Sequence, residues 1–166
     1  MFKKTLVMLA LAAFVVVPVV ALAATDNQVL TINATVAARA KLVLAPTVIN
    51  FPDADPDLTP VISANENAVN VLANVRTSSA GVSTLTCLAN GDLSSGSDQI
   101  AISNVSWTAG GTGYLPGTMS NAAAQPVGSW VGSGANTGTL DFFLANSWAY
   151  AVGNYTQTVT YTLTSP

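Results

Sequence analysis

The stretch Val69-Asn-Val-Leu-Ala-Asn-Val-Arg76 decides the fold, because apolar and polar side chains alternate along most of it with period two. Such alternation, rich in β-branched valine, is typical of a strand with one face in a core. The turn-forming run Thr77-Ser-Ser-Ala-Gly81 follows, and residues 82–89 then alternate again. We therefore predict a hairpin in which residues 69–75 and 82–89 pair as antiparallel strands.

Alternating segments with intervening turn signals continue along the rest of the chain, and no sustained helical stripe accompanies them. Further predicted strands cover residues 30–36, 42–44, 48–51, 100–107, 127–131, 139–144 and 155–163. Between Ile102 and Val105 the phase slips, which predicts a bulge. Turn signals at spacings of about 8 to 12 residues favour a sandwich. The predicted fold class is all-β, an antiparallel immunoglobulin-like β-sandwich with less than about a tenth helix.

Residues 1–23 have the pattern of an export signal. Lys3 and Lys4 precede an apolar run that Pro18 interrupts, and Ala-Leu-Ala at 21–23 has the small-x-small pattern of a cleavage site. Cleavage there predicts a single mature domain, residues 24–166. The alternative is an uncleaved anchor, because the run approaches the roughly 20 residues that span a bilayer.

Charge is sparse and mostly negative. Without Lys3 and Lys4, the mature chain has three basic and eight acidic side chains and therefore a net charge of −5. The basic residues are Arg39, Lys41 and Arg76. A chain of this charge repels phosphate backbones and anionic lipid. We therefore predict no nucleic-acid partner and no membrane contact after signal cleavage.

The composition leaves little material for catalysis. The chain has no histidine and one cysteine, so a nucleophilic serine lacks its usual base and a zinc cluster lacks ligands. We predict a non-enzyme without cofactor. Cys87 has no partner for an internal disulfide, and is interpreted as a buried apolar thiol or, alternatively, an intermolecular link.

Two groups of residues are candidate binding sites. Asp53, Asp55 and Asp57 alternate in a loop and have the oxygen ligands that calcium prefers, but the intervening prolines favour a stiff, solvated connection, so we predict no metal site. Large aromatic residues could stack on sugar rings, although filling a core of small side chains is the favoured interpretation. These residues are Trp107, Trp130, Trp148, Tyr114 and Tyr150.

The C-terminal run resembles the last strand of chaperone-usher pilins. Gly153 stands fourteen positions from the end, and Tyr155, Val159, Tyr161 and Leu163 share one face of the run that follows. The same ending has a weaker resemblance to WxL-type bacterial surface domains. Ser165 replaces the penultimate aromatic residue of the pilins.

The beginning of the mature chain resembles spore coat U and fimbrial-like domains. The run Val29-Leu-Thr-Ile-Asn-Ala-Thr-Val36, followed by Ala37-Ala-Arg-Ala-Lys-Leu42 and later Ile49-Asn-Phe51, carries this resemblance. Arg39 lies near the place where that family usually has a cysteine, which leaves Cys87 without the family's bridge partner.

These resemblances imply a non-catalytic, exported structural subunit of a bacterial surface fibre or coat. It would assemble by β-strand addition, with itself or with a periplasmic chaperone as partner, and lie in the periplasm, at the cell surface or outside the cell, with a role in adhesion. The predicted assembly residues are Leu30, Ile32, Ala34, Val36, Gly153, Tyr155, Val159, Tyr161 and Leu163. The alternative function is a small secreted module that binds glycan or another surface polymer through its aromatic second half.

Overall fold

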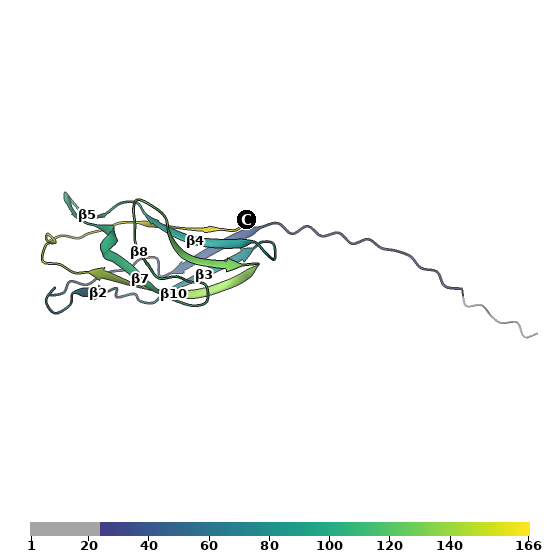
Figure 1. Cartoon of the computed structure of the whole chain (residues 1–166), viewed down its shortest axis with the longest axis horizontal. Coiled ribbons are helices and arrows are strands. Elements are labelled where there is room, and N and C mark those ends of the chain that lie inside the picture. The colour runs from purple at the N-terminus through teal and green to yellow at the C-terminus, as the bar shows by residue number, and fades with distance from the viewer. Residues whose placement is uncertain (1–23) are drawn as a thin grey trace, which may run out of the picture. The chain divides into compact units, whose positions relative to one another are not determined.

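The computed structural model describes residues 24–166, so the predicted export signal lies outside the described residues (Figure 1). Residues 24–166 contain twelve short elements, and all except the 3₁₀ turn Ile102–Asn104 are β-strands. Every strand pair among them is antiparallel. The prediction of an all-β fold with antiparallel sheets is therefore confirmed.

The larger sheet has the order β1-β3-β10-β7-β8, with β2 paired to the end of β10. Its long strand β10 pairs with β3 through its first half and with β7 and β2 through its second. The strands are β1 (Arg39–Ala45), β2 (Val61–Ser63), β3 (Val69–Arg76), β7 (Val105–Gly110), β8 (Gly117–Thr118) and β10 (Gly134–Ala145).

The second sheet has the order β11-β4-β9, and a separate hairpin joins β5 to β6. The strands are β4 (Val82–Ala89), β5 (Leu93–Ser95), β6 (Asp98–Ile100), β9 (Gln125–Val131) and β11 (Val159–Thr164). The inward faces of the two main sheets supply one shared cluster of buried side chains. Leu85 and Val127 from the second sheet and Ala73 and Leu140 from the first are fully buried in it.

The predicted hairpin of residues 69–75 and 82–89 is wrong, although both strands exist. β3 lies between β1 and β10 in the first sheet, whereas β4 lies between β11 and β9 in the second. The intervening turn crosses between the sheets and bonds to the β9–β10 turn, with Gly132 N–H donating to Gly81 O at 2.8 Å. Alternation marks each strand correctly, but partner choice depends on long-range contacts that local spacing does not encode.

The predicted bulge near residue 103 is also wrong, since the 3₁₀ turn Ile102–Asn104 takes its place. The Asp92 carboxylate accepts a hydrogen bond from the Ile102 backbone N–H at 2.9 Å. A 3₁₀ turn changes the side-chain phase as a bulge does. The phase slip in the sequence is therefore real, but its structural cause differs from the predicted one.

Aromatic rings fill the core where glycines leave room for them. Tyr114 is buried, and the single hydrogen of its hydroxyl is shared between Val71 O and Asn136 O, which lie 3.1 and 2.8 Å from the hydroxyl oxygen. A methyl group added to Gly138 of β10 would collide with the Tyr114 ring. Trp130 packs edge-on against Tyr114, with ring centroids 4.9 Å apart. The glycines of the second half therefore serve close packing as well as turns.

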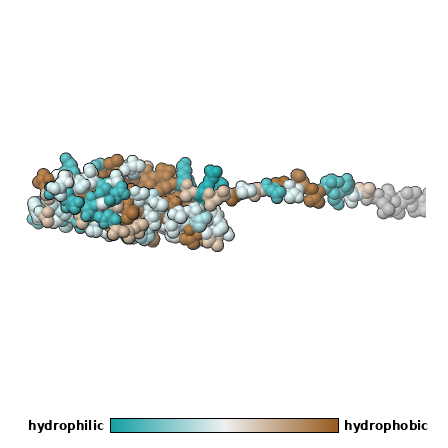
Figure 2. Space-filling view, turned by 90° about the horizontal axis from the view of Figure 1, so that it is seen from above, coloured by the Kyte–Doolittle hydropathy of each residue, from teal (hydrophilic) through white to brown (hydrophobic). Residues whose placement is uncertain are grey.

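Residues 24–34 belong to a separate unit from the compact unit Thr35–Pro166. Residues 24–38 are exposed throughout and form neither helix nor strand, so the predicted strand over 30–36 has no partner within the described chain. Figure 1 shows this segment as an extended trace, and Figure 2 shows apolar and polar side chains interspersed along it. We call residues 26–36 the extension.

Overpacking at Gly138 provides a test of this core. We expect Gly138→Ala to lower the free energy of unfolding by about 1–3 kcal/mol, because the added methyl has to displace a buried tyrosine. Gly134→Ala on the same strand is the control, since its methyl would meet only Asn136 Oδ1, at 3.8 Å. Urea unfolding of mature protein, followed by tryptophan fluorescence, measures both. Equal stability of the two variants would contradict the described packing.

Candidate functional site

The two sheets are joined by backbone hydrogen bonds along only one side. Near β8 and β9, Leu115 N–H donates to Val127 O and Ser129 N–H donates to Gly113 O, both at 2.9 Å. On the other side β1 and β11 are the sheet edges, and no backbone hydrogen bond joins them among the described residues. Each of these two strands therefore has one edge without a ladder partner within residues 24–166.

The core is incomplete along this open side. Val71 and Ala73 of β3 are buried, but Leu42 and Leu44, which lie opposite them on β1, are only half-buried. Inward-facing Tyr161 and Leu163 of β11 are likewise half-buried. Apolar side chains that point inward but stay partly exposed mark a surface that lacks a covering element.

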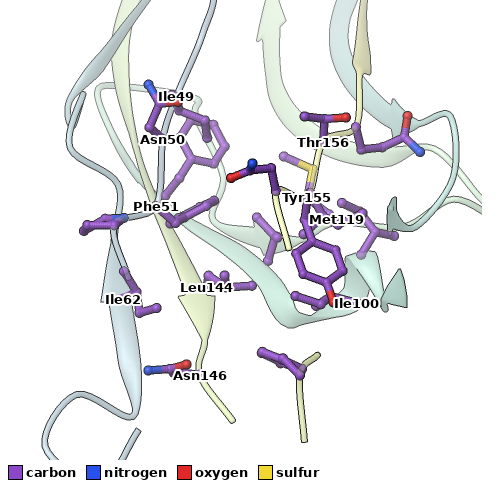
Figure 3. A pocket seen from close by; sticks show the side chains of 18 of the residues that line it. Ile49, Asn50, Phe51, Ile62, Ile100, Met119, Leu144, Asn146, Tyr155 and Thr156 are labelled. Carbon is purple, nitrogen blue, oxygen red and sulfur yellow. The ribbon is translucent and has the colours of Figure 1, made fainter. Parts of the chain in front are cut away.

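An apolar groove of about 1490 Å³ occupies this side of the domain. In Figure 3, Phe51, Ile62 and Leu144 line one wall, and Ile100, Met119 and Tyr155 line the other. The groove exceeds the roughly 300–1,000 Å³ of typical small-molecule sites. Its position between the edges of β1 and β11 suits an extended peptide, which can pair with a strand edge and place alternate side chains inside.

A carboxylate fixes the loop at the groove's rim. Glu66 accepts two hydrogen bonds from Asn50, from the backbone N–H at 2.6 Å and from the side-chain Nδ2 at 2.7 Å. The side-chain and backbone hydrogen bonds from Asn50 lower the pKa of Glu66 below its ordinary value. Asn50 itself lines the groove, so this clamp holds part of the wall. The predicted strand over 48–51 is wrong, since the segment is a groove-lining loop.

The three alternating aspartates stay together in the loop between β1 and β2. Asp55 Oδ1 accepts the Asp57 N–H at 2.9 Å, which closes a local turn, and Asp57 Oδ1 accepts the Trp148 indole N–H at 3.1 Å. No group of three or more His, Cys, Asp or Glu among residues 24–166 is arranged to hold a metal ion. Asp53 and Asp55 border the groove instead.

The candidate sugar-stacking residues are mostly buried. Trp107 and Trp130 are 2 % and 8 % exposed, and each donates its indole N–H to a backbone carbonyl, of Leu115 and Thr112 respectively. Tyr114 is buried and Tyr150 half-buried. Trp148 alone of the five presents a broad surface, with 70 % of it exposed. The core-filling interpretation therefore holds for Trp107, Trp130 and Tyr114.

Some of the predicted C-terminal assembly residues lie on strand β11, and the others lie before it. Val159, Tyr161 and Leu163 face the core from β11, the strand whose edge borders the open side, whereas Gly153 and Tyr155 precede the strand. A single bridge between Ser94 and Thr156 interrupts the expected run, so the predicted strand over 155–163 begins later than expected. Its N-terminal half is held by β5 and by the β4–β5 turn, where Asn90 bonds to Thr158.

The predicted N-terminal assembly residues share one property, which is full accessibility. Leu30 and Ile32 are 82 % and 83 % exposed, and Val36 is 70 % exposed. Ala34 is exposed as well. The structure thus leaves these alternating side chains unburied within the described chain.

Cys87 is a buried thiol beneath the groove. It is 1 % exposed, its Sγ lies 3.9 Å from Met119 Sδ, and burial raises its pKa to about 11. Burial also raises the pKa of Tyr161, its cross-strand neighbour on β11. Both groups are therefore protonated at neutral pH, which favours the apolar-thiol interpretation of Cys87 over the intermolecular link.

Comparison with known proteins adds no family assignment: the chain matches no protein-family model and has no significant match among curated proteins. Within residues 24–166, no helix has the length and apolar character needed to cross a bilayer.

The Glu66 clamp predicts a pH dependence of stability. A carboxylate whose pKa is lower in the folded state stabilises the fold fully above its unfolded pKa of about 4.3, and this contribution disappears as pH falls through the folded pKa. We expect Glu66→Gln to lower the urea midpoint at pH 7 and to lose this effect at the acid end of the range. An equal deficit at every pH would contradict the clamp.

Burial of Cys87 predicts slow chemical modification. We expect iodoacetamide at pH 8 to label the native mature protein at least tenfold more slowly than the urea-unfolded protein, because the buried thiol stays protonated and inaccessible. Mass spectrometry measures the labelled fraction over time. Equal rates in the two states would place the thiol at the surface.

Proposed function

We propose that this chain is a non-catalytic, exported structural subunit of a bacterial surface fibre or coat, pilin-like, that assembles by β-strand addition. In this proposal the extension of one subunit inserts into the apolar groove of the next. A single observation carries the proposal: residues 24–166 contain both an apolar groove between two strand edges that are unpaired among these residues and an exposed, alternating segment that pairs with none of them.

The two parts are complementary in chemistry. The groove is lined by apolar side chains from β1 and β11, and the extension offers apolar residues at every second position from Leu30 to Val36. Burial of Leu30, Ile32 and Val36 would contribute about 1.5–3 kcal/mol each. The free edge of β11 would supply backbone hydrogen bonds, as in β-augmentation. An immunoglobulin-like sandwich that lacks one strand is the finer fold description that fits this proposal.

Sequence features support the proposed location of the protein and its proposed partners. Lys3, Lys4 and the Ala-Leu-Ala run at 21–23 support export to the periplasm, the cell surface or the exterior. An exposed groove between unpaired edges invites aggregation, so a periplasmic chaperone that covers it is the proposed partner before assembly. The net charge of −5 disfavours nucleic acid and anionic membranes as partners.

One observation favours the second candidate, a secreted glycan-binding module. The exposed Trp148 ring is held at its indole N–H by Asp57, and a fixed, accessible aromatic face can stack on a sugar ring. This function requires neither the groove nor the extension. Assembly therefore separates the two candidates.

A charge placed on the inward positions of the extension tests the strand-addition proposal. We expect Ile32→Asp to abolish assembly of mature protein, since the groove would have to bury an unpaired carboxylate. Ile32 is 83 % exposed in the described chain, so the subunit itself should keep its urea midpoint. Thr31→Asp is the matched control, because it lies on the opposite face of an extended strand. Negative-stain microscopy and size-exclusion chromatography measure assembly.

A synthetic peptide of residues 26–36 provides the complementary measurement. We expect it to bind Ile32→Asp mature protein, whose own extension is disabled, and to lower the protein's binding of a hydrophobic dye. A wild-type protein that stays monodisperse and ignores the peptide would overturn the proposal in favour of the glycan-binding module.

A further inference from the structure

All three cations of the mature chain lie at one end of the larger sheet. Arg39 and Arg76 are directly opposite each other in the β1–β3 ladder, and Lys41 lies two residues further along β1. Residues of this spacing share a face, and inward-facing Leu42 places the three cations on the outer face. The C-terminus lies at the same end, since Ser165 Oγ donates to Arg76 O at 3.0 Å. We call Arg39, Lys41 and Arg76 the cationic end.

No Asp or Glu side chain within the described residues forms an ion pair with the cationic end. None of the three side chains makes an ion pair or a hydrogen bond with another part of residues 24–166. Like charges directly opposite each other in a ladder are destabilising. Arg39 and Arg76 nevertheless face each other, so an anionic surface outside the chain would relieve their repulsion.

The acidic residues at the groove lie at the other end of the same domain. Asn146, just beyond β10, holds the acidic loop through its Nδ2, which donates to Ala54 O at 2.9 Å and to Thr59 O at 3.0 Å. The first residue of β10, Gly134, pairs with Val75 beside the cationic end. Twelve residues of strand, about 40 Å, therefore separate the two ends. Figure 1 shows β2 and the C-terminus at opposite ends of the domain.

The groove lies toward this acidic end. Its lining includes the second half of β1, the start of β11, and the loops that follow β1 and β10. Asp53 and Asp55 belong to its lining, and Asp57 is two residues further along the same loop. We call Asp53, Asp55 and Asp57 the acidic mouth.

The chain itself brings the cationic end close to whatever the extension occupies. Only Ala37 and Ala38 separate Val36 from Arg39, the first residue of β1. Three residue steps span at most about 11 Å, which is slightly more than the Debye length of about 8–10 Å at 0.15–0.1 M salt. When the extension of one subunit occupies the groove of another, the cationic end of the first subunit therefore lies within this distance of the point where the extension leaves that groove.

From this placement we propose that the cationic end of one subunit docks on the acidic mouth of a second copy of this chain. The inference rests on the proposed strand addition and names the contact that accompanies it. The occupant of the groove is the extension of the second copy, and charge complementarity sets the polarity of the junction. An extension inserted in the reverse direction would bring two cationic ends together, at a cost in repulsion.

Paired charge reversals test this junction. The double substitution Arg39→Glu with Lys41→Glu changes the net side-chain charge of the cationic end from +3 to −1, while the acidic mouth keeps its charge of −3. The double substitution Asp53→Lys with Asp57→Lys changes the net side-chain charge of the acidic mouth from −3 to +1, while the cationic end keeps its charge of +3. We expect each pair to slow assembly at least tenfold in low salt, and the combination of all four substitutions to restore most of the rate. Asp55 is unchanged because it closes the local turn.

Asp141→Lys is the matched control, since this residue lies on β10 opposite Thr108, away from both ends, and its carboxylate makes no hydrogen bond within residues 24–166. It should assemble at the wild-type rate. High salt should reduce the difference between the charge-reversed pairs and the wild type, because screening weakens exposed charge pairs. Wild-type rates for both reversed pairs, or no recovery in the combined variant, would overturn the proposed junction.

The peptide of residues 26–36 distinguishes failure of the junction from failure of strand addition. It contains no lysine or arginine, and its one charged side chain, Asp26, lies at the end away from Val36, so it should bind the Ile32→Asp protein within about threefold whether or not the charge pairs are reversed. Peptide binding with charge-independent assembly would reject the junction alone. Absence of peptide binding would reject strand addition and the junction together.

Discussion

The structure depends on a constraint at two strands: within residues 24–166, β1 and β11 each have a ladder partner on one side only. Backbone groups and apolar side chains on the open side are accessible, and a sheet edge of this kind is a template for another strand. The half-buried state of Leu42, Leu44, Tyr161 and Leu163 follows directly, because no element of the described part of the chain covers the gap between the edges. The groove and the proposed mode of assembly both derive from this one missing ladder.

Local pattern was sufficient to predict the strands but not their partners. The stretch from Val69 to Arg76 is a strand because its valines face a core, and its alternation shows this without any other information. Its placement in a different sheet from β4 was not predictable. The Thr77–Gly81 run fits either a hairpin turn or a crossing between the two sheets, and the choice depends on contacts with β10, more than fifty residues away. The unpaired state of residues 30–36 has the same origin, because an alternating segment looks identical whether its partner belongs to its own chain or to another.

The candidate site was partly predictable for a similar reason. Val159, Tyr161 and Leu163 were identified from their shared face, and they do line or border the open side. Phe51 and Met119 were missed as groove residues, because a groove wall built from loops has no period. Only burial distinguishes the aromatic residues that fill the core from the exposed Trp148. Glycines at 113, 117 and 128 leave space for the rings of Trp130 and Trp107, and sequence spacing does not show which glycine lies against which ring.

The seven-residue ladder between β1 and β3 has a mechanical consequence in a fibre assembled in the proposed way. Tension along the fibre would enter each subunit through the extension and pull on Arg39, along the axis of β1. Ladder hydrogen bonds run perpendicular to the strand, so such a load shears all of them together instead of opening them one by one. With a single cysteine there is no internal disulfide to limit extension of the chain. The force at which a subunit yields would therefore be set by this ladder and by the strand in the groove, whichever slips first.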